Sequence, residues 1–294
     1  MKIFGGYALV TSIAAALLAA CGGAQPPIGA PGAMPPSSIY SQISTGQSAP
    51  RLSRGVHFAY VPNLYSDDVT AYAINANSGA LKHVKGSPFA AGSQPWAVAI
   101  DPTGKFTYVT NYHSDNVCAY AINASTGALT QVQGSPFAAG AYSYEVAIDS
   151  TGKFAYVTNG YVSGRGNVVA FAIHASSGAL TQVPGSPFAA GYFPFGLATA
   201  PTGNFLYVVN AGSNNVSTYA INATSGALTH VKDSKTGSSP YGVAIDPTGK
   251  FAYVTNYDSK NVSGYGIDAS NGTFKGLKGS PFKADRGPSN VAIR

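Results

Sequence analysis

Charged residues are scarce in this sequence, and those present are scattered. Only 10% of the 294 residues are Asp, Glu, Lys or Arg, while 45% are hydrophobic. Disordered chains combine high charge with low hydrophobicity, so the composition indicates a folded protein. The formal net charge is +6, but no dense Lys/Arg run exists, which argues against nucleic-acid binding. Glutamate occurs once, at Glu145.

Cysteine is also rare, and one of the two cysteines stands at an informative place. Lys2 is followed by an uncharged apolar run to Ala20, which is typical of an export signal. Leu18-Ala19-Ala20-Cys21 resembles a bacterial lipobox, and this resemblance implies cleavage before Cys21 and lipid attachment to it. The alternative is a plain secretory signal with an incidental cysteine. Lipidation would leave Cys118 without a disulfide partner, and we expect it to be a small packed residue.

These features divide the chain into three parts. Residues 1–20 are the predicted lipoprotein signal peptide, and residues 21–54, rich in Gly, Pro, Ser and Ala, are a predicted flexible tether. Residues 55–294 are the predicted folded part. We expect the protein to be lipid-anchored in the cell envelope; Gly22 after Cys21 resembles outer-membrane sorting signals.

Glycine (35) and tyrosine (19) are abundant, and they recur with a period. Tyr-Val-x-Asn stands five times at intervals of 46 to 51 residues: Tyr60–Asn63, Tyr108–Asn111, Tyr156–Asn159, Tyr207–Asn210 and Tyr253–Asn256. A fixed period of this length is typical of repeat folds. The chain therefore contains five copies of one structural unit.

The second copy shows the content of the unit. It predicts strands over Trp96–Ile100, Lys105–Asn111, Val117–Asn123 and Ala128–Val132, with the turn Asp101–Gly104 after the first. The third strand is apolar on both alternating faces, as in a sheet covered on both sides. GSPFAAG follows the fourth strand, and we expect its Phe to insert between units. Four short antiparallel strands per unit predict an all-β propeller of four-stranded blades.

The phase of the repeat predicts how the propeller closes. The pattern begins with a second strand, Val56–Asn63, and ends with a first strand, Asn290–Arg294. If the last strand completes the first blade, the chain forms a closed five-bladed ring without free sheet edges. The alternative is a piece of a larger ring.

The Tyr-Val-Thr-Asn motifs, with Asp-Pro-Thr-Gly-Lys at 101–105 and 246–250, are similar to the repeats of the lactonase-like β-propeller family. That family includes 6-phosphogluconolactonases and usually has seven blades. The resemblance covers residues 56–294. It implies a propeller fold and a possible lactone hydrolysis, and many relatives of this kind are exported proteins without a known role.

Departures from the repeat indicate where a site could lie. The loops after strands two and four vary between copies, and variable loops on a regular frame commonly carry binding sites. First strands begin near these loops with aromatic residues, which either stack on a ligand or pack between blades. The candidate ligand-binding residues are Trp96, Tyr142, Tyr144, Glu145, Arg165 and Tyr241.

Glu145 and Arg165 are also the weak catalytic candidates. Glu145 could be a general base, and Arg165 could bind an anion or pair with Glu145. The repeated Asn residues are expected to hydrogen-bond loop backbone. The sequence offers no metal-ligand set, cofactor motif or nucleophile elbow. We therefore favour a non-catalytic scaffold for a small molecule, glycan or protein; the alternative is a lactonase-like hydrolase of a sugar lactone or related ester.

Overall fold

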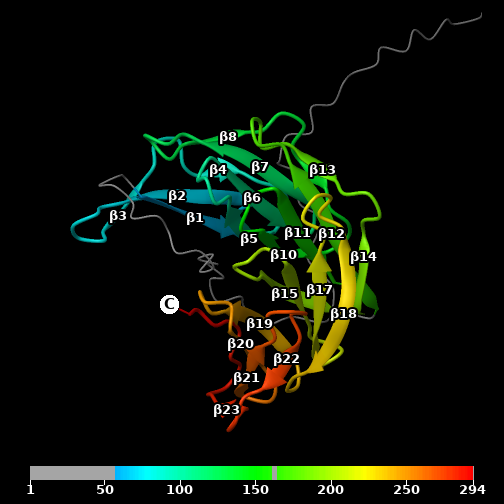
Figure 1. Cartoon of the computed structure of the whole chain (residues 1–294). Coiled ribbons are helices and arrows are strands. Elements are labelled where there is room, and N and C mark those ends of the chain that lie inside the picture. The colour runs from blue at the N-terminus through cyan, green and yellow to red at the C-terminus, as the bar shows by residue number, and fades with distance from the viewer. Residues whose placement is uncertain (1–56, 161–163, 294) are drawn as a thin grey trace, which may run out of the picture.

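The computed structural model describes residues 57–160 and 164–293, and it places five antiparallel sheets side by side along an arc (Figure 1). The second sheet contains β5 (Pro95–Ile100), β6 (Phe106–Asn111), β7 (Asn116–Ile122) and β8 (Leu129–Gln131), paired in chain order. The two-residue β9 (Phe137–Ala138) pairs with the other end of β7. The predicted four-stranded unit is therefore confirmed, with one short strand added.

The other sheets repeat this plan. The first has β1 (His57–Asn63), β2 (Asp68–Ile74), β3 (Leu81–His83) and β4 (Phe89–Ala90), and the third has β10 (Ser143–Ile148), β11 (Phe154–Asn159), β12 (Arg165–Ile173), β13 (Leu180–Gln182) and β14 (Phe188–Tyr192). The fourth has β15 (Pro194–Thr199), β16 (Phe205–Asn210), β17 (Asn215–Ile221) and β18 (Leu228–Lys235). The fifth has β19 (Pro240–Ile245), β20 (Phe251–Asn256), β21 (Asn261–Ile267), β22 (Phe274–Gly276) and β23 (Phe282–Lys283).

The GSPFAAG segments form the outer crossing from one sheet to the next. In the copy after β8, Ser135 Oγ accepts a hydrogen bond from the backbone N–H of Ala119 at 2.9 Å, and Phe137 pairs with Val117. Phe137 is half-buried and packs against a core cluster, whereas Phe282 in the last copy is 43% exposed. The segment thus caps its own sheet, and the prediction that each Phe inserts between blades is too strong.

Buried tyrosines join each sheet to the next. The Tyr108 hydroxyl donates to the carbonyl of Gly178, which lies in a turn of the third sheet, at 3.0 Å. Phe106 packs on the same turn, and a Cβ added to Gly178 would lie 2.3 Å from its ring. Gly178 also has a φ of +73°, so glycine is required there for two reasons. Tyr60 and Tyr156 make the equivalent bonds to Gly127 and Gly226.

The closed five-bladed ring is wrong. Within the described residues β1 pairs only with β2, and the residues after β23 form no strand. Figure 1 shows the first and last sheets at opposite ends of an open arc.

The C-terminal segment lies beside the fifth sheet instead of the first. A Cβ added to Gly242 in β19 would lie 2.9 Å from the Ser289 carbonyl oxygen. In the same way, a Cβ added to Gly196 in β15 would lie 2.4 Å from the Tyr241 carbonyl oxygen in the neighbouring β19. Gly287 has a φ of +64°, matching the positive φ that precedes the other inner strands, for example Gln94 at 53°. Residues 287–293 therefore occupy the place of an inner strand of a sixth blade.

Candidate functional site

Most candidate residues lie on or next to the inner strands, by which we mean the first strands of the second to fifth sheets: β5, β10, β15 and β19. Each inner strand begins with a shift in its pairing register. In β10, Ser143 pairs with Asn159 and Val146 with Val157, so Tyr144 and Glu145 lie in a register shift. The same shift occurs in β5, β15 and β19. Bulges of this kind change the direction of side chains next to functional sites. The sequence did not reveal them, because a bulge depends on the partner strand.

Threonines of the second strands hold these bulges in place. Thr158 Oγ1 accepts from the backbone N–H of Glu145 at 3.1 Å and donates to the carbonyl of Phe195 in the next sheet at 2.7 Å. Thr110 Oγ1 donates to the Tyr144 carbonyl at 2.6 Å in the same way. Neighbouring inner strands are thereby tied together at the residues that carry the candidate side chains.

Carboxylates from the preceding sheet fix where the inner strands begin. Tyr142, with a φ of 56°, donates its backbone N–H to Asp115 Oδ1 at 2.8 Å. Asp67 does the same for Gln94. Lys260 stands at the equivalent place in the fifth sheet, and its side chain has no acceptor. The sixth inner-strand position therefore lacks this cap.

Eight aromatic rings from four sheets form one connected group, which we call the inner aromatic cluster. Ring centroids of successive members lie 4.6–5.9 Å apart. Its members are Trp96, Tyr112, Tyr142, Tyr144, Phe193, Phe195, Tyr241 and Tyr257. Such tilted and edge-on contacts stabilise one another beyond simple burial.

Only part of the cluster is accessible. Tyr144 is fully buried, and this burial, with the nearby Tyr112 hydroxyl, raises its pKa strongly. Burial also raises the pKa of Tyr241. Tyr142 is 37% exposed and Trp96 is partly exposed. The packing interpretation thus holds for Tyr144, whereas Tyr142 and Trp96 present surface on which a ligand could stack.

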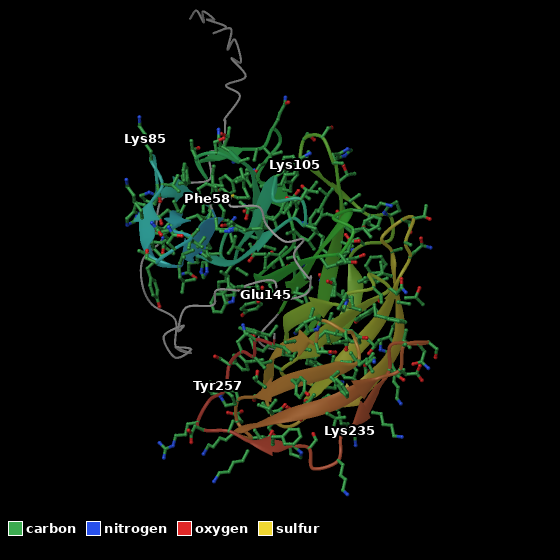
Figure 2. The ribbon with its side chains drawn as sticks, turned by 60° about the vertical axis from the view of Figure 1, so that its left-hand side comes forward. Phe58, Lys85, Lys105, Glu145, Lys235 and Tyr257 are labelled. Carbon is green, nitrogen blue, oxygen red and sulfur yellow. The ribbon has the colours of Figure 1, made fainter. Side chains whose placement is uncertain are left out.

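Glu145 is buried with this cluster, at 4% exposure. Figure 2 shows it near the middle of the molecule, on the inner side of the arc. Sister sheets carry Ala97, Gly196 and Gly242 at its position, so the fold itself does not require a carboxylate there. A buried carboxyl group is a common feature of catalytic acids and bases.

Arg165 lies elsewhere and does not pair with Glu145. Its guanidinium carbon sits 5.2 Å from the centroid of the Tyr192 ring, an exposed cation–π contact at the start of β12. The only ion pair among the described residues joins His230 and Asp233. The structure thus separates the two catalytic candidates.

A second group of polar side chains surrounds Asp233 in β18, at residues 233–239 where the sequence departs from the repeat. Asp233 Oδ1 accepts from Ser217 Oγ at 2.7 Å and lies 2.9 Å from His230 Nε2. Partial burial raises the pKa of Asp233, but these hydrogen bonds outweigh it and hold the pKa below its usual value. His230 and Asp233 are about half exposed. Asp233 opens the segment that replaces GSPFAAG, whose serine accepts a hydrogen bond from the third strand in the other sheets.

The repeated asparagines have the structural role that the sequence predicted. Asn111 Oδ1 accepts from the backbone N–H of Gly92, and Asn210 and Asn256 accept from Gly191 and Gly237, at 3.0–3.1 Å. Each thus holds the segment that enters the inner strand of its own sheet. Over the described ranges, no three His, Cys, Asp or Glu side chains gather closely enough to hold a metal ion.

Cys118 is a packed residue as predicted, because it is fully buried in the core at β7. It is also disulfide-bonded, so the expectation that it lacks a disulfide partner is wrong. The other cysteine of the chain, Cys21, lies outside the described residues, as do the predicted signal peptide and tether. The described part contains no helix with the length and apolar character needed to cross a bilayer.

The comparisons with known families agree with this architecture. The profile described as "Lactonase, 7-bladed beta-propeller" matches residues 33–143, 135–243 and 198–287. This finding, with the open arc, overturns the closed five-bladed ring: the family is seven-bladed, and the described residues form five sheets of a propeller. A search of curated proteins found no match.

Solved structures give the same fold. A Bacteroides fragilis protein described as a "putative 6-phosphogluconolactonase" is 22% identical with a TM-score of 0.68, covering 78% of this chain and 68% of that one. A periplasmic gluconolactonase of Pseudomonas aeruginosa is 23% identical with a TM-score of 0.63, covering 80% and 69%. At these identities the likeness concerns the fold alone.

Proposed function

Because this chain belongs to the lactonase, seven-bladed β-propeller family, we propose that it is a lactonase-like hydrolase of a sugar lactone or related ester. The observation that carries the proposal is the burial of Glu145, the one glutamate of the chain, which is only 4% exposed. It lies in a β-bulge that Thr158 holds by a hydrogen bond, next to Tyr144 of the inner aromatic cluster. The family match supports this function more strongly than the scaffold function that composition favoured.

In the proposed reaction Glu145 acts as general base. Its carboxylate takes a proton from water, the water oxygen attacks the lactone carbonyl, and the ring C–O bond then breaks. The departing alkoxide receives the proton back from Glu145, so the products are the open hydroxy acid. The exposed parts of Tyr142 and Trp96 supply an apolar surface against which a sugar ring can stack.

The experiment compares lactone hydrolysis by the wild type, Glu145→Gln and Glu145→Ala. Loss of a general base lowers the rate by about 10²–10⁴-fold. Alanine stands at the equivalent Ala97, so Glu145→Ala should keep the fold. Asp268→Asn is the matched control, because Asn75, Asn123 and Asn222 occupy that exposed turn position in sister sheets.

Two results would overturn the proposal. One is a wild type that opens no sugar lactone, with or without divalent metal. The other is a folded Glu145→Gln variant that keeps its rate within a few-fold of the wild type.

A second candidate function is ligand binding without catalysis. Tyr142 and Tyr192, 37% and 48% exposed, lie on the side of the variable loops, and Arg165 stacks on Tyr192. A small molecule, glycan or protein bound there would be released by Tyr192→Ala with no effect on lactone turnover. This result would separate the two functions.

The envelope location and the lipid anchor also remain proposals. The intact mass of the exported protein tests the anchor: a lipid adds mass at Cys21, and a mature chain without that added mass would overturn the proposal.

A further inference from the structure

The outer edge of the fifth sheet is more basic than the edges of the second and third sheets. Residues 228–286, from β18 onward, carry eight Lys or Arg and five Asp, a formal charge of +3. Residues 93–192, the second and third sheets, carry three Lys or Arg and four Asp or Glu, a charge of −1. The C-terminal end of the described part is therefore more basic than its middle, while the first sheet carries Lys82 and Lys85 at the positions of Lys275 and Lys278.

The difference arises from substitutions at equivalent positions. Lys275, Lys278 and Lys283 stand where the second sheet has Thr130, Gln133 and Ala138. All three lysines are exposed. Both β22 and β23 pair with β21 on the same side, so the three lysines share one sheet edge.

An aromatic ring is exposed along the same edge. Phe282 is 43% exposed, whereas Phe89, Phe137 and Phe188 at the equivalent positions are half-buried. Phe282 directly precedes Lys283. We call Lys275, Lys278, Phe282 and Lys283 the basic edge.

The neighbouring β18 extends this edge. Lys235 occupies the position of Lys283, because Asn215 pairs with Lys235 as Asn261 pairs with Lys283. The Tyr265 hydroxyl of the fifth sheet donates to the Lys235 carbonyl at 2.6 Å, which holds the two edges together. Figure 2 shows Lys235 at this end of the molecule and Lys85 at the other. Asp233 is engaged by His230 and Ser217, and Asp285 is the exposed acid next to the edge.

We propose that the basic edge docks on an anionic lipid bilayer. Each lysine near an anionic surface adds to the attraction between protein and bilayer, and an exposed ring beside the lysines can enter the headgroup region. Lysines on a sheet edge also prevent edge-to-edge pairing. That role does not need an exposed Phe, and the second-sheet edge, with β8 and β9, has no lysine.

The test measures co-sedimentation of residues 50–294, which include every described residue, with vesicles of phosphatidylcholine containing about one-third phosphatidylglycerol. The edge variant is Lys275→Thr, Lys278→Gln and Lys283→Ala, each change taken from the second sheet. Its matched control is Lys105→Asn, Lys153→Asn and Lys250→Asn, because Asn204 stands at that turn position in the fourth sheet.

We expect the edge variant to lower the partition coefficient by about tenfold to a hundredfold, while the control stays near the wild type. Salt at about 0.5 M should release the wild type. Phe282→Ala should weaken binding without changing its salt dependence. The proposal is overturned if the wild type does not bind these vesicles, if both triple variants lose binding equally, or if soluble dextran sulfate is bound as well as the vesicles. None of these outcomes depends on lactone turnover.

Discussion

At the scale of the residue, the repeat provides internal controls for single hydrogen bonds. Tyr156 donates to the Gly226 carbonyl at 3.1 Å, whereas the Tyr207 hydroxyl, equally buried, has no partner in the described structure. The Tyr207 ring stacks on Phe274, which replaces the leucine of the other sheets. Among the four equivalent tyrosines that precede a further sheet (Tyr60, Tyr108, Tyr156 and Tyr207), Tyr207 therefore lacks the bond that the other three make.

We predict that Tyr156→Phe lowers the free energy of unfolding by about 1–2 kcal/mol, because it leaves a buried carbonyl without its donor. Tyr207→Phe removes a hydroxyl that binds nothing and should be neutral or slightly stabilising. Urea denaturation of the two variants measures this difference. Equal losses in both would show that the hydroxyl at Tyr207 has a partner after all.

At the scale of the element, threonine hydroxyls of the second strands join neighbouring inner strands by hydrogen bonds. Thr158 bridges Glu145 and Phe195, but Val209 stands at its position in the fourth sheet, so the tie toward Tyr241 is missing. We predict that Thr158→Val costs about 1–3 kcal/mol by leaving two backbone groups without partners.

The converse change tests the same idea. A buried Val→Thr substitution ordinarily costs about 1–3 kcal/mol when its hydroxyl finds no partner. Val209→Thr should cost less than about 0.5 kcal/mol, because the geometry of Thr110 and Thr158 offers it two partners. A loss of 2 kcal/mol or more in thermal or urea unfolding would contradict this.

The elements themselves were largely predictable. Trp96–Ile100 and Lys105–Asn111 were expected as strands and are found as β5 and β6 within one residue at each end. The two-residue β9 was missed, because it exists only by pairing with β7. The bulges held by threonine hydrogen bonds were missed for the same reason, because they depend on contacts between distant residues. Thr110 and its acceptor, the Tyr144 carbonyl, are 34 residues apart.

At the scale of the whole molecule, counting strands was not sufficient. Five copies of each strand are compatible with a closed ring. They are equally compatible with an open arc in which residues 287–293 lie beside β19. Curvature decides between these, and curvature is set by packing between sheets. For the site, the sequence identified Glu145 and Tyr142 as departures from the repeat, but it could not show that Arg165 stacks on Tyr192.

The ties between sheets also make the stability of the molecule sensitive to alkaline pH. Burial raises the pKa of Tyr60 to about 12, and burial likewise raises that of Tyr219 to about 12, from the ordinary 10.0. Both hydroxyls donate to backbone carbonyls. Below pH 10 they are protonated in the folded and unfolded chains, and their contribution is complete. Between pH 10 and 12 the unfolded chain loses these protons first, so the free energy of unfolding falls.

We therefore predict that the urea midpoint drops steeply from pH 10 to 12. Tyr60→Phe should lower the midpoint at pH 8 and reduce the drop, because one titrating group has been removed. Tyr65→Phe is the control, since Tyr65 is 79% exposed, and it should change neither value. A midpoint that stays constant to pH 12, or a Tyr60→Phe variant whose drop equals that of the wild type, would show that these tyrosines do not link the sheets.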